Sequence, residues 1–170
     1  WQGRGTGMGS NRDWFITSEK DFPRGMKWSA DYIRDKGFKP GIWLIPFTQS
    51  NTEMWENQPS LFVHREDGDT AGIREKAWGF PDIDPRDENI EWMGHYIIDP
   101  TGKVGQEYLK RVLAMLCDEW GYDYVKIDAQ GEMTRVYAAH RTRMCDPSLS
   151  ADRAYRYGLE AIRSAMGPSR

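Results

Sequence analysis

The sequence has 170 residues, the length of one ordinary domain, with 39% hydrophobic and 29% charged residues. Its 8 Trp, 8 Tyr and 6 Phe exclude a disordered tail. A formal net charge of -3 gives no electrostatic reason to expect nucleic acid or an anionic membrane as partner, and no apolar run approaches the roughly 20 residues of a membrane span.

The first residue and the cysteines set two further bounds. The chain opens on Trp1 rather than Met, so we expect it to be part of a longer protein. Cys117 and Cys145 are too few for a disulfide framework and lack metal-ligand spacing. They therefore identify neither a disulfide scaffold nor a metal site.

The first half of the chain predicts a helix, a strand and a long loop. Apolar residues at helical spacing over 24–36, after Pro23 and before Gly37, indicate a helix. The apolar run 42–45, closed by Pro46, indicates a buried strand. Region 47–93 has turn signals without a sustained period. Loops of that length are usually functional or carry small elements of their own.

The second half alternates strand and helix. The pattern predicts a short strand at 96–99, a helix over about 104–120 and a strand at 122–128. A loop through Pro147 then leads to a last helix over about 150–166. Strands that alternate with helices favour parallel βαβ units and an α/β fold, for which an open doubly wound sheet and a (β/α)8 barrel both fit.

The sharpest chemical feature is the pair Lys126 and Asp128. Side chains alternate along a strand, so both lie on one face of the 122–128 strand while Val125 and Ile127 lie on the other. Charged groups on an apolar strand are costly unless they meet each other or a polar cavity. At the C-terminal end of a barrel strand that cavity is the active site, where a nearby ammonium favours an ionised carboxylate nucleophile. The alternative is an internal ion pair that closes the strand.

Other candidate residues each have a structural alternative. Asp99 ends the neighbouring strand, where an Asx turn with Pro100 and Thr101 is the favoured interpretation. Trp43 fits either a core or a platform for a sugar ring. Three tryptophans of the long loop fit an aromatic lid over a saccharide or packing of the loop on itself: Trp55, Trp78 and Trp92. Trp14 is a candidate anchor for a satellite core.

The histidines do not indicate a metal site. They lie far apart and show no ligand spacing: His64, His95 and His140. Metal binding therefore has little support. The chain also lacks a serine-nucleophile elbow and a cysteine framed by local catalytic signals.

Six segments form an ordered set of motifs: Asp13-Trp14, FPRGMK at 22–27, ADYI at 30–33, GFKPGIW at 37–43, YIID at 96–99 and YDYVKID at 122–128. Together they resemble the catalytic barrel of α-galactosidases of glycoside hydrolase family 36, with relatives in families 27 and 31. The resemblance covers roughly residues 1–130, and the combination of the FPxGMK and KxD segments is specific. The Asp128-Ala129-Gln130 segment is similar to the raffinose-synthase-like branch.

The resemblance implies a (β/α)8 barrel and retaining transfer or hydrolysis of an α-galactosyl group. That chemistry needs no metal or organic cofactor. Asp128 matches the family's nucleophile, Lys126 matches a lysine that binds sugar hydroxyls, and Trp43 lies where a strand delivers a residue to the pocket. The acid/base carboxylate and the paired aspartates that hold the galactose hydroxyls fall outside this chain. An arginine that the family places before the third strand has no match at 93–95, which bears on galactose preference more than on the reaction.

We therefore predict that 1–170 is part of one catalytic barrel domain, truncated at both ends and inactive alone. It would span roughly the second to fourth strands and carry the long loop at about 47–93. Asp128 is the expected nucleophile. The candidate sugar contacts are Lys126, Trp43, Asp99 and Trp92. The substrate is an oligosaccharide or other glycoside. An α-glucosidase, an α-N-acetylgalactosaminidase, a galactosyl transferase and a non-catalytic carbohydrate-binding barrel remain alternatives.

Overall fold

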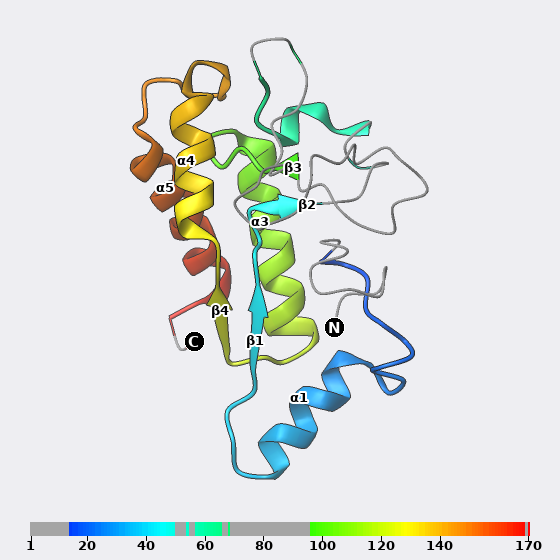
Figure 1. Cartoon of the computed structure of the whole chain (residues 1–170). Helices are drawn as coiled ribbons and strands as arrows, with labels where there is room; N and C mark the ends of the chain where they lie inside the picture. Colours follow the sequence, from blue (N-terminus) through cyan, green and yellow to red (C-terminus); the bar gives the residue numbers. More distant parts are fainter. Residues whose placement is uncertain (1–13, 50–53, 55–56, 66–67, 69–95, 169) are drawn as a thin grey trace.

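A computed structural model describes residues 14–49, 54, 57–65, 68, 96–168 and 170 (Figure 1). Its elements in chain order are α1 (Gly25–Asp35), β1 (Gly41–Leu44), β2 (Thr48–Gln49), the 3-10 turn η1 (Pro59–Leu61), β3 (Tyr96–Ile97), α3 (Lys103–Ala114), the π-helical turn η3 (Met115–Glu119), β4 (Tyr124–Ile127), α4 (Gln130–Ala139), the 3-10 turn η4 (Arg141–Arg143) and α5 (Ala151–Met166). The described part of the chain is therefore mixed α/β, as the sequence predicts.

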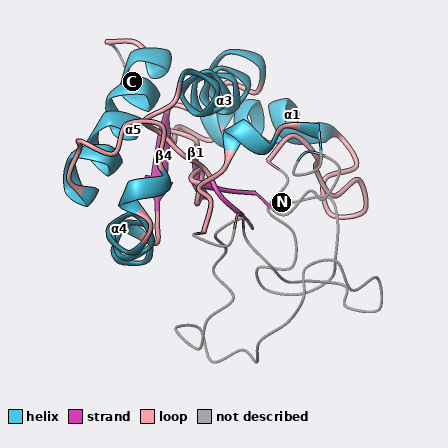
Figure 2. Cartoon of the chain, turned by 90° about the horizontal axis from the view of Figure 1, so that it is seen from above, coloured by secondary structure: helices cyan, strands magenta, loops and turns pink. Residues whose placement is uncertain are grey.

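The centre of the fold is a parallel pair of strands, β1 and β4, with Gly41 opposite Tyr124 and Trp43 opposite Lys126. Figure 2 shows α1, α3 and α5 along one side of this pair. Ile42 and Leu44 of β1 are buried, whereas Tyr124 and Lys126 of β4 are exposed. One face of the pair thus packs into the core and the other carries the polar candidates.

The expected strand at 96–99 forms, but its expected place among the parallel strands is wrong. β3 pairs antiparallel with β2, and Phe62 bridges to Ile98 on the same side. β1 pairs directly with β4, so no strand lies between them. A turn over 45–48, in which Thr48 donates its N–H to the carbonyl of Ile45, ends the β1 segment and starts β2, and β2 is the antiparallel partner of β3. The long loop therefore carries small elements of its own.

The helices follow the predicted pattern, with one omission. The described α1, α3 and α5 agree with the predicted spans to within a few residues, and α3 continues as the π-helical turn η3. Ser150 caps α5 by accepting a hydrogen bond from the N–H of Arg153. The segment after Asp128, expected to be a loop, instead contains α4. Its buried Met133, Val136 and Tyr137 pack it onto the core.

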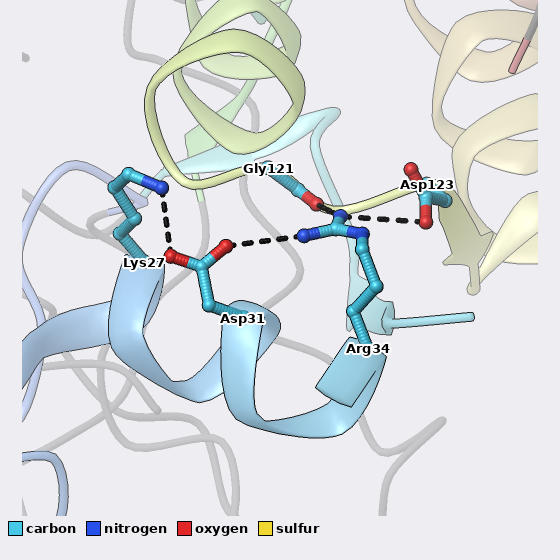
Figure 3. A network of polar contacts seen from close by, with 5 residues as sticks. All are labelled: Lys27, Asp31, Arg34, Gly121 and Asp123. Carbon is cyan, nitrogen blue, oxygen red and sulfur yellow. Dashed lines mark hydrogen bonds and ion pairs between the residues drawn. The ribbon is translucent and has the colours of Figure 1, made fainter. Parts of the chain in front are cut away.

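A polar network joins α1 to the start of β4 (Figure 3). Arg34 lies next to Asp31 on α1 and donates to the carbonyl of Gly121 and to the Asp123 carboxylate, while Lys27 pairs with Asp31 from the preceding turn. Gly121 has a φ of 79°, a left-handed conformation that glycine adopts without strain. The network fixes the end of the strand pair opposite to Asp128.

Candidate active site

The site lies where β4 ends. The N–H of Asp128 donates to the carbonyl of Leu44 at 3.1 Å, which carries the parallel hydrogen bonding one residue past Ile127. Asp128 therefore follows the strand closely enough to lie on the same face as Lys126. Trp43 reaches that face from β1, because it lies opposite Lys126 in the register.

The structure brings three of the predicted site residues together. Lys126 Nζ lies 2.7 Å from Asp128 Oδ2, and Trp43 Nε1 donates to the same oxygen at 2.9 Å. The other oxygen, Oδ1, accepts the N–H of Ala129 at 3.0 Å. The side chains of Lys126 and Asp128 are 61% and 43% exposed, so a ligand has access to the pair.

These donors hold the carboxylate in its ionised form. The hydrogen bond from Lys126, followed by those from Trp43 and from the Ala129 N–H, lowers the pKa of Asp128 to about 2. Such a group is an anion at every pH above about 3. It suits the role of a nucleophile and not that of a general acid, which must carry a proton near the working pH.

The indole of Trp43 is itself held in place. It packs edge-on against Trp14, with ring centroids 6.5 Å apart and planes inclined by 66°. Trp14 is fully buried and donates its Nε1–H to the carbonyl of Thr48 at 2.7 Å. The expected role of Trp14 as a core anchor is confirmed, and it supports a residue of the site.

Asp99 does not fit the expectation that it contacts a sugar. Asp99 is 1% exposed, and its Oδ1 accepts hydrogen bonds from the N–H of Thr101 at 2.9 Å and from the Thr101 hydroxyl at 2.6 Å. Its Oδ2 accepts the N–H of Cys145 at 2.7 Å. The favoured Asx-turn interpretation is therefore confirmed. Cys145 is an exposed residue, but partial desolvation of its thiol, to which the charge of Asp99 adds, raises the pKa to about 11 and disfavours a thiolate there.

Two further sequence expectations concern residues elsewhere in the chain. Trp92 and the other expected lid tryptophans, Trp55 and Trp78, lie outside the described residues. Among the residues that the structure describes, no group of three or more His, Cys, Asp or Glu side chains could hold a metal ion. No helix within the same described ranges is long and apolar enough to cross a membrane.

Ala129 is the site residue that sequence reasoning missed. Its φ of 65° is left-handed, a conformation that a non-glycine residue adopts rarely. An alanine gives no sequence signal for it, because glycine, asparagine and aspartate are the residues that usually mark such a turn. Only the backbone reveals that its N–H faces Asp128.

The fold is similar to parts of several solved glycosidase structures. The α-galactosidase from Thermus thermophilus in complex with p-nitrophenyl α-D-galactopyranoside aligns with a TM-score of 0.59 and 22% identity, over 88% of this chain and 26% of that chain. AgaB, a family 36 α-galactosidase from Geobacillus stearothermophilus, aligns with a TM-score of 0.54 and 20% identity, over 92% of this chain and 19% of that chain. No protein-family model matches the chain.

A third solved structure gives the same result. The α-galactosidase from Lactobacillus brevis aligns with a TM-score of 0.53 and 17% identity, over 91% of this chain and 18% of that chain. The structural neighbours are thus α-galactosidases, including members of family 36, and the resemblance stated from the motifs is confirmed at the level of the fold. This chain spans about a quarter of the length of those proteins or less.

Proposed function

We propose that this chain is part of a (β/α)8 barrel of a retaining glycosidase that cleaves α-galactosides. The observation that carries the proposal is the Asp128 carboxylate, ionised by Lys126 and Trp43 on the open face of two parallel strands. Barrel enzymes place their catalytic groups at the carboxyl ends of such strands. The fold likeness to α-galactosidases fits the same assignment.

In the proposed reaction Asp128 attacks the anomeric carbon and forms a glycosyl ester. A depressed pKa keeps the attacking group ionised, and it also makes the carboxylate a good leaving group when water later cleaves the ester. The leaving oxygen takes its proton from a second carboxylic acid about 5–5.5 Å away. We assign that acid to a part of the barrel outside this chain.

Lys126 and Trp43 are the proposed contacts to the sugar. The Lys126 ammonium has three N–H donors, so it can bind Asp128 and a sugar hydroxyl at the same time. Trp43 presents a partly exposed indole beside the same carboxylate. The galactoside assignment follows from the structural neighbours, which are α-galactosidases, one of them in complex with p-nitrophenyl α-D-galactopyranoside.

The test uses the complete protein that contains this chain. We expect it to turn over an aryl α-galactoside faster than the corresponding α-glucoside or α-N-acetylgalactosaminide. Asp128→Asn should abolish that turnover, because an amide cannot form the glycosyl ester. Asp123→Asn is the matched control: it makes the same chemical change on a carboxylate at the other end of β4, where the partner is Arg34.

Each outcome separates the alternatives. Galactoside turnover lost only in Asp128→Asn supports the proposal. Preference for another glycoside keeps the mechanism and overturns the substrate. Sugar binding without turnover, unchanged in Asp128→Asn, would establish a non-catalytic carbohydrate-binding barrel instead.

A further inference from the structure

The backbone at Ala129 is unusual for its place in the fold. Among the residues that the structure describes, it is the one non-glycine residue with a positive φ, at φ 65° and ψ 29°. An L-residue with a Cβ adopts this conformation at a cost, and residues held in this way gather at functional sites. Ala129 stands between the proposed nucleophile and the first residue of α4.

The left-handed turn separates the two polar groups of Ala129. Its carbonyl accepts the N–H of Met133 at 3.1 Å and begins the hydrogen bonding of α4. Its N–H stays outside the helix and donates to Asp128 Oδ1 at 3.0 Å. The strained residue thus points one backbone donor at one oxygen of the carboxylate.

The two oxygens of Asp128 consequently differ. Oδ2 accepts two donors, from Lys126 and Trp43, which engage both of its lone pairs. Oδ1 accepts one donor from the described residues, the Ala129 N–H, and keeps one lone pair for a further bond. Attack through Oδ2 would break a charge-assisted hydrogen bond, whereas attack through Oδ1 breaks none.

We propose that Ala129 is a positioning residue that directs Oδ1 of Asp128 to the anomeric carbon, while Oδ2 remains bound to Lys126 and Trp43. The proposal rests on the proposed glycosidase function. It names the carboxylate oxygen that bonds to the sugar, whereas the proposed function names only the residue.

The assignment gives each atom a part in the two steps. In the first step a lone pair of Oδ1 forms the bond to the anomeric carbon, and the bond to the leaving oxygen breaks. That oxygen keeps the electron pair and takes a proton from the second carboxylic acid. In the second step water forms the new bond and gives a proton to the same acid/base group. The electron pair of the broken ester bond then returns to Oδ1, while the donors on Oδ2 stabilise the restored carboxylate.

The direct test is a crystal structure of the trapped ester. A 5-fluoro-α-galactosyl fluoride is the trapping reagent for the complete protein: its fluorine slows hydrolysis of the glycosyl ester, while the fluoride leaving group keeps ester formation fast. We expect the bonded oxygen to be the one nearest the Ala129 N–H, with Lys126 and Trp43 still on the other. A bond through the oxygen that faces Lys126 and Trp43 overturns the proposal and leaves the glycosidase function intact. No adduct on Asp128 contradicts the proposed function and the inference with it.

A second test isolates the Ala129 N–H. Lactic acid in place of Ala129, introduced by cell-free translation, keeps the methyl group and replaces only the N–H by oxygen. The acid limb of the pH profile for inactivation by the fluoro sugar should then move to higher pH, and kcat should fall by about tenfold with a smaller change in KM. The control is lactic acid at Ala138, an exposed residue of the same helix, which should leave the acid limb in place. An acid limb unmoved by the change at 129 overturns the positioning role.

Discussion

The replacement of Lys126 by methionine tests the electrostatics of the site most sharply, because Lys126 is the largest cause of the low pKa of Asp128. Methionine keeps much of the apolar stem and removes the ammonium. The pKa of Asp128 falls from an ordinary 3.8 to about 2, and at about 1.36 kcal/mol per unit this is at most about 2.4 kcal/mol for all the donors together. Solvent screens a pair that is 61% and 43% exposed, so we assign Lys126 about 0.5–1 kcal/mol.

The sign of the pH dependence follows from the direction of that shift. A carboxylate whose pKa is lowered by folding stabilises the protein above its unfolded value of 3.8, and the contribution disappears as the pH falls through about 2. Lys126→Met should therefore lower the free energy of unfolding at pH 7 by up to about 1 kcal/mol. The difference from the wild type should shrink as the pH falls from about 4 to 2.

The assay is the pH profile of inactivation by the fluoro sugar, in which the acid limb reports the ionisation of Asp128. The midpoint of this acid limb should move to higher pH by roughly half a unit in Lys126→Met. Lys27→Met is a closely matched control, because the Lys27–Asp31 pair has the same 2.7 Å separation and side chains that are 66% and 42% exposed. The reasoning is refuted if the limb stays in place in Lys126→Met, or moves equally in Lys27→Met.

The remaining predictions concern groups around the site. Trp43→Phe keeps an aromatic ring but removes the indole N–H that donates to Asp128, so it should raise the pKa of Asp128 and lower kcat/KM by about tenfold to a hundredfold. The pH profile of kcat/KM measures both effects. Both carboxylate oxygens of Asp99 accept a backbone N–H, and an amide has only one acceptor oxygen, so Asp99→Asn should lower the free energy of unfolding by about 1–3 kcal/mol. It should leave KM unchanged in steady-state kinetics. Gly105→Ala should lower the free energy of unfolding, measured by thermal unfolding, by about 3 kcal/mol, because the added Cβ would lie 1.8 Å from the Asp99 carbonyl oxygen. Gly131 has open space around it, so Gly131→Ala should raise the same free energy by about 1 kcal/mol.

Local sequence patterns were sufficient for most elements of the fold. The helices α1, α3 and α5 each bury one regularly spaced face. The sequence of β1 is a short apolar run between prolines, and that of β4 alternates between an exposed and a half-buried face. α4 was missed because it begins with Gln130, Gly131 and Glu132, of which glycine is a poor helix former, and because its three buried residues make only a short apolar face. The sense of β3 could not be read from its sequence, because its partner β2 is a strand of only two residues within the long loop and no local pattern marks it.

The candidate site, like the fold, has features that the sequence predicts and features that only the tertiary structure reveals. Strand alternation alone placed Lys126 and Asp128 on one face, and the 2.7 Å contact agrees with it. The hydrogen bond from Trp43 depends on the register of β1 against β4, which no local pattern encodes. The left-handed backbone of Ala129 opposes the intrinsic preference of alanine, so only the tertiary structure can hold it.

The structure also joins residues of three of the motifs. Trp14, Trp43 and Asp128 belong to three separate motifs, yet they form one chain of contacts from a buried anchor to the exposed carboxylate. A buried Trp14 fixes the edge against which Trp43 packs, and Trp43 in turn fixes one oxygen of Asp128. The nucleophilic role that we propose for Asp128 needs such rigidity, because a small displacement of the attacking atom lowers the rate strongly. Each of the three motifs therefore supplies one residue of this chain of contacts.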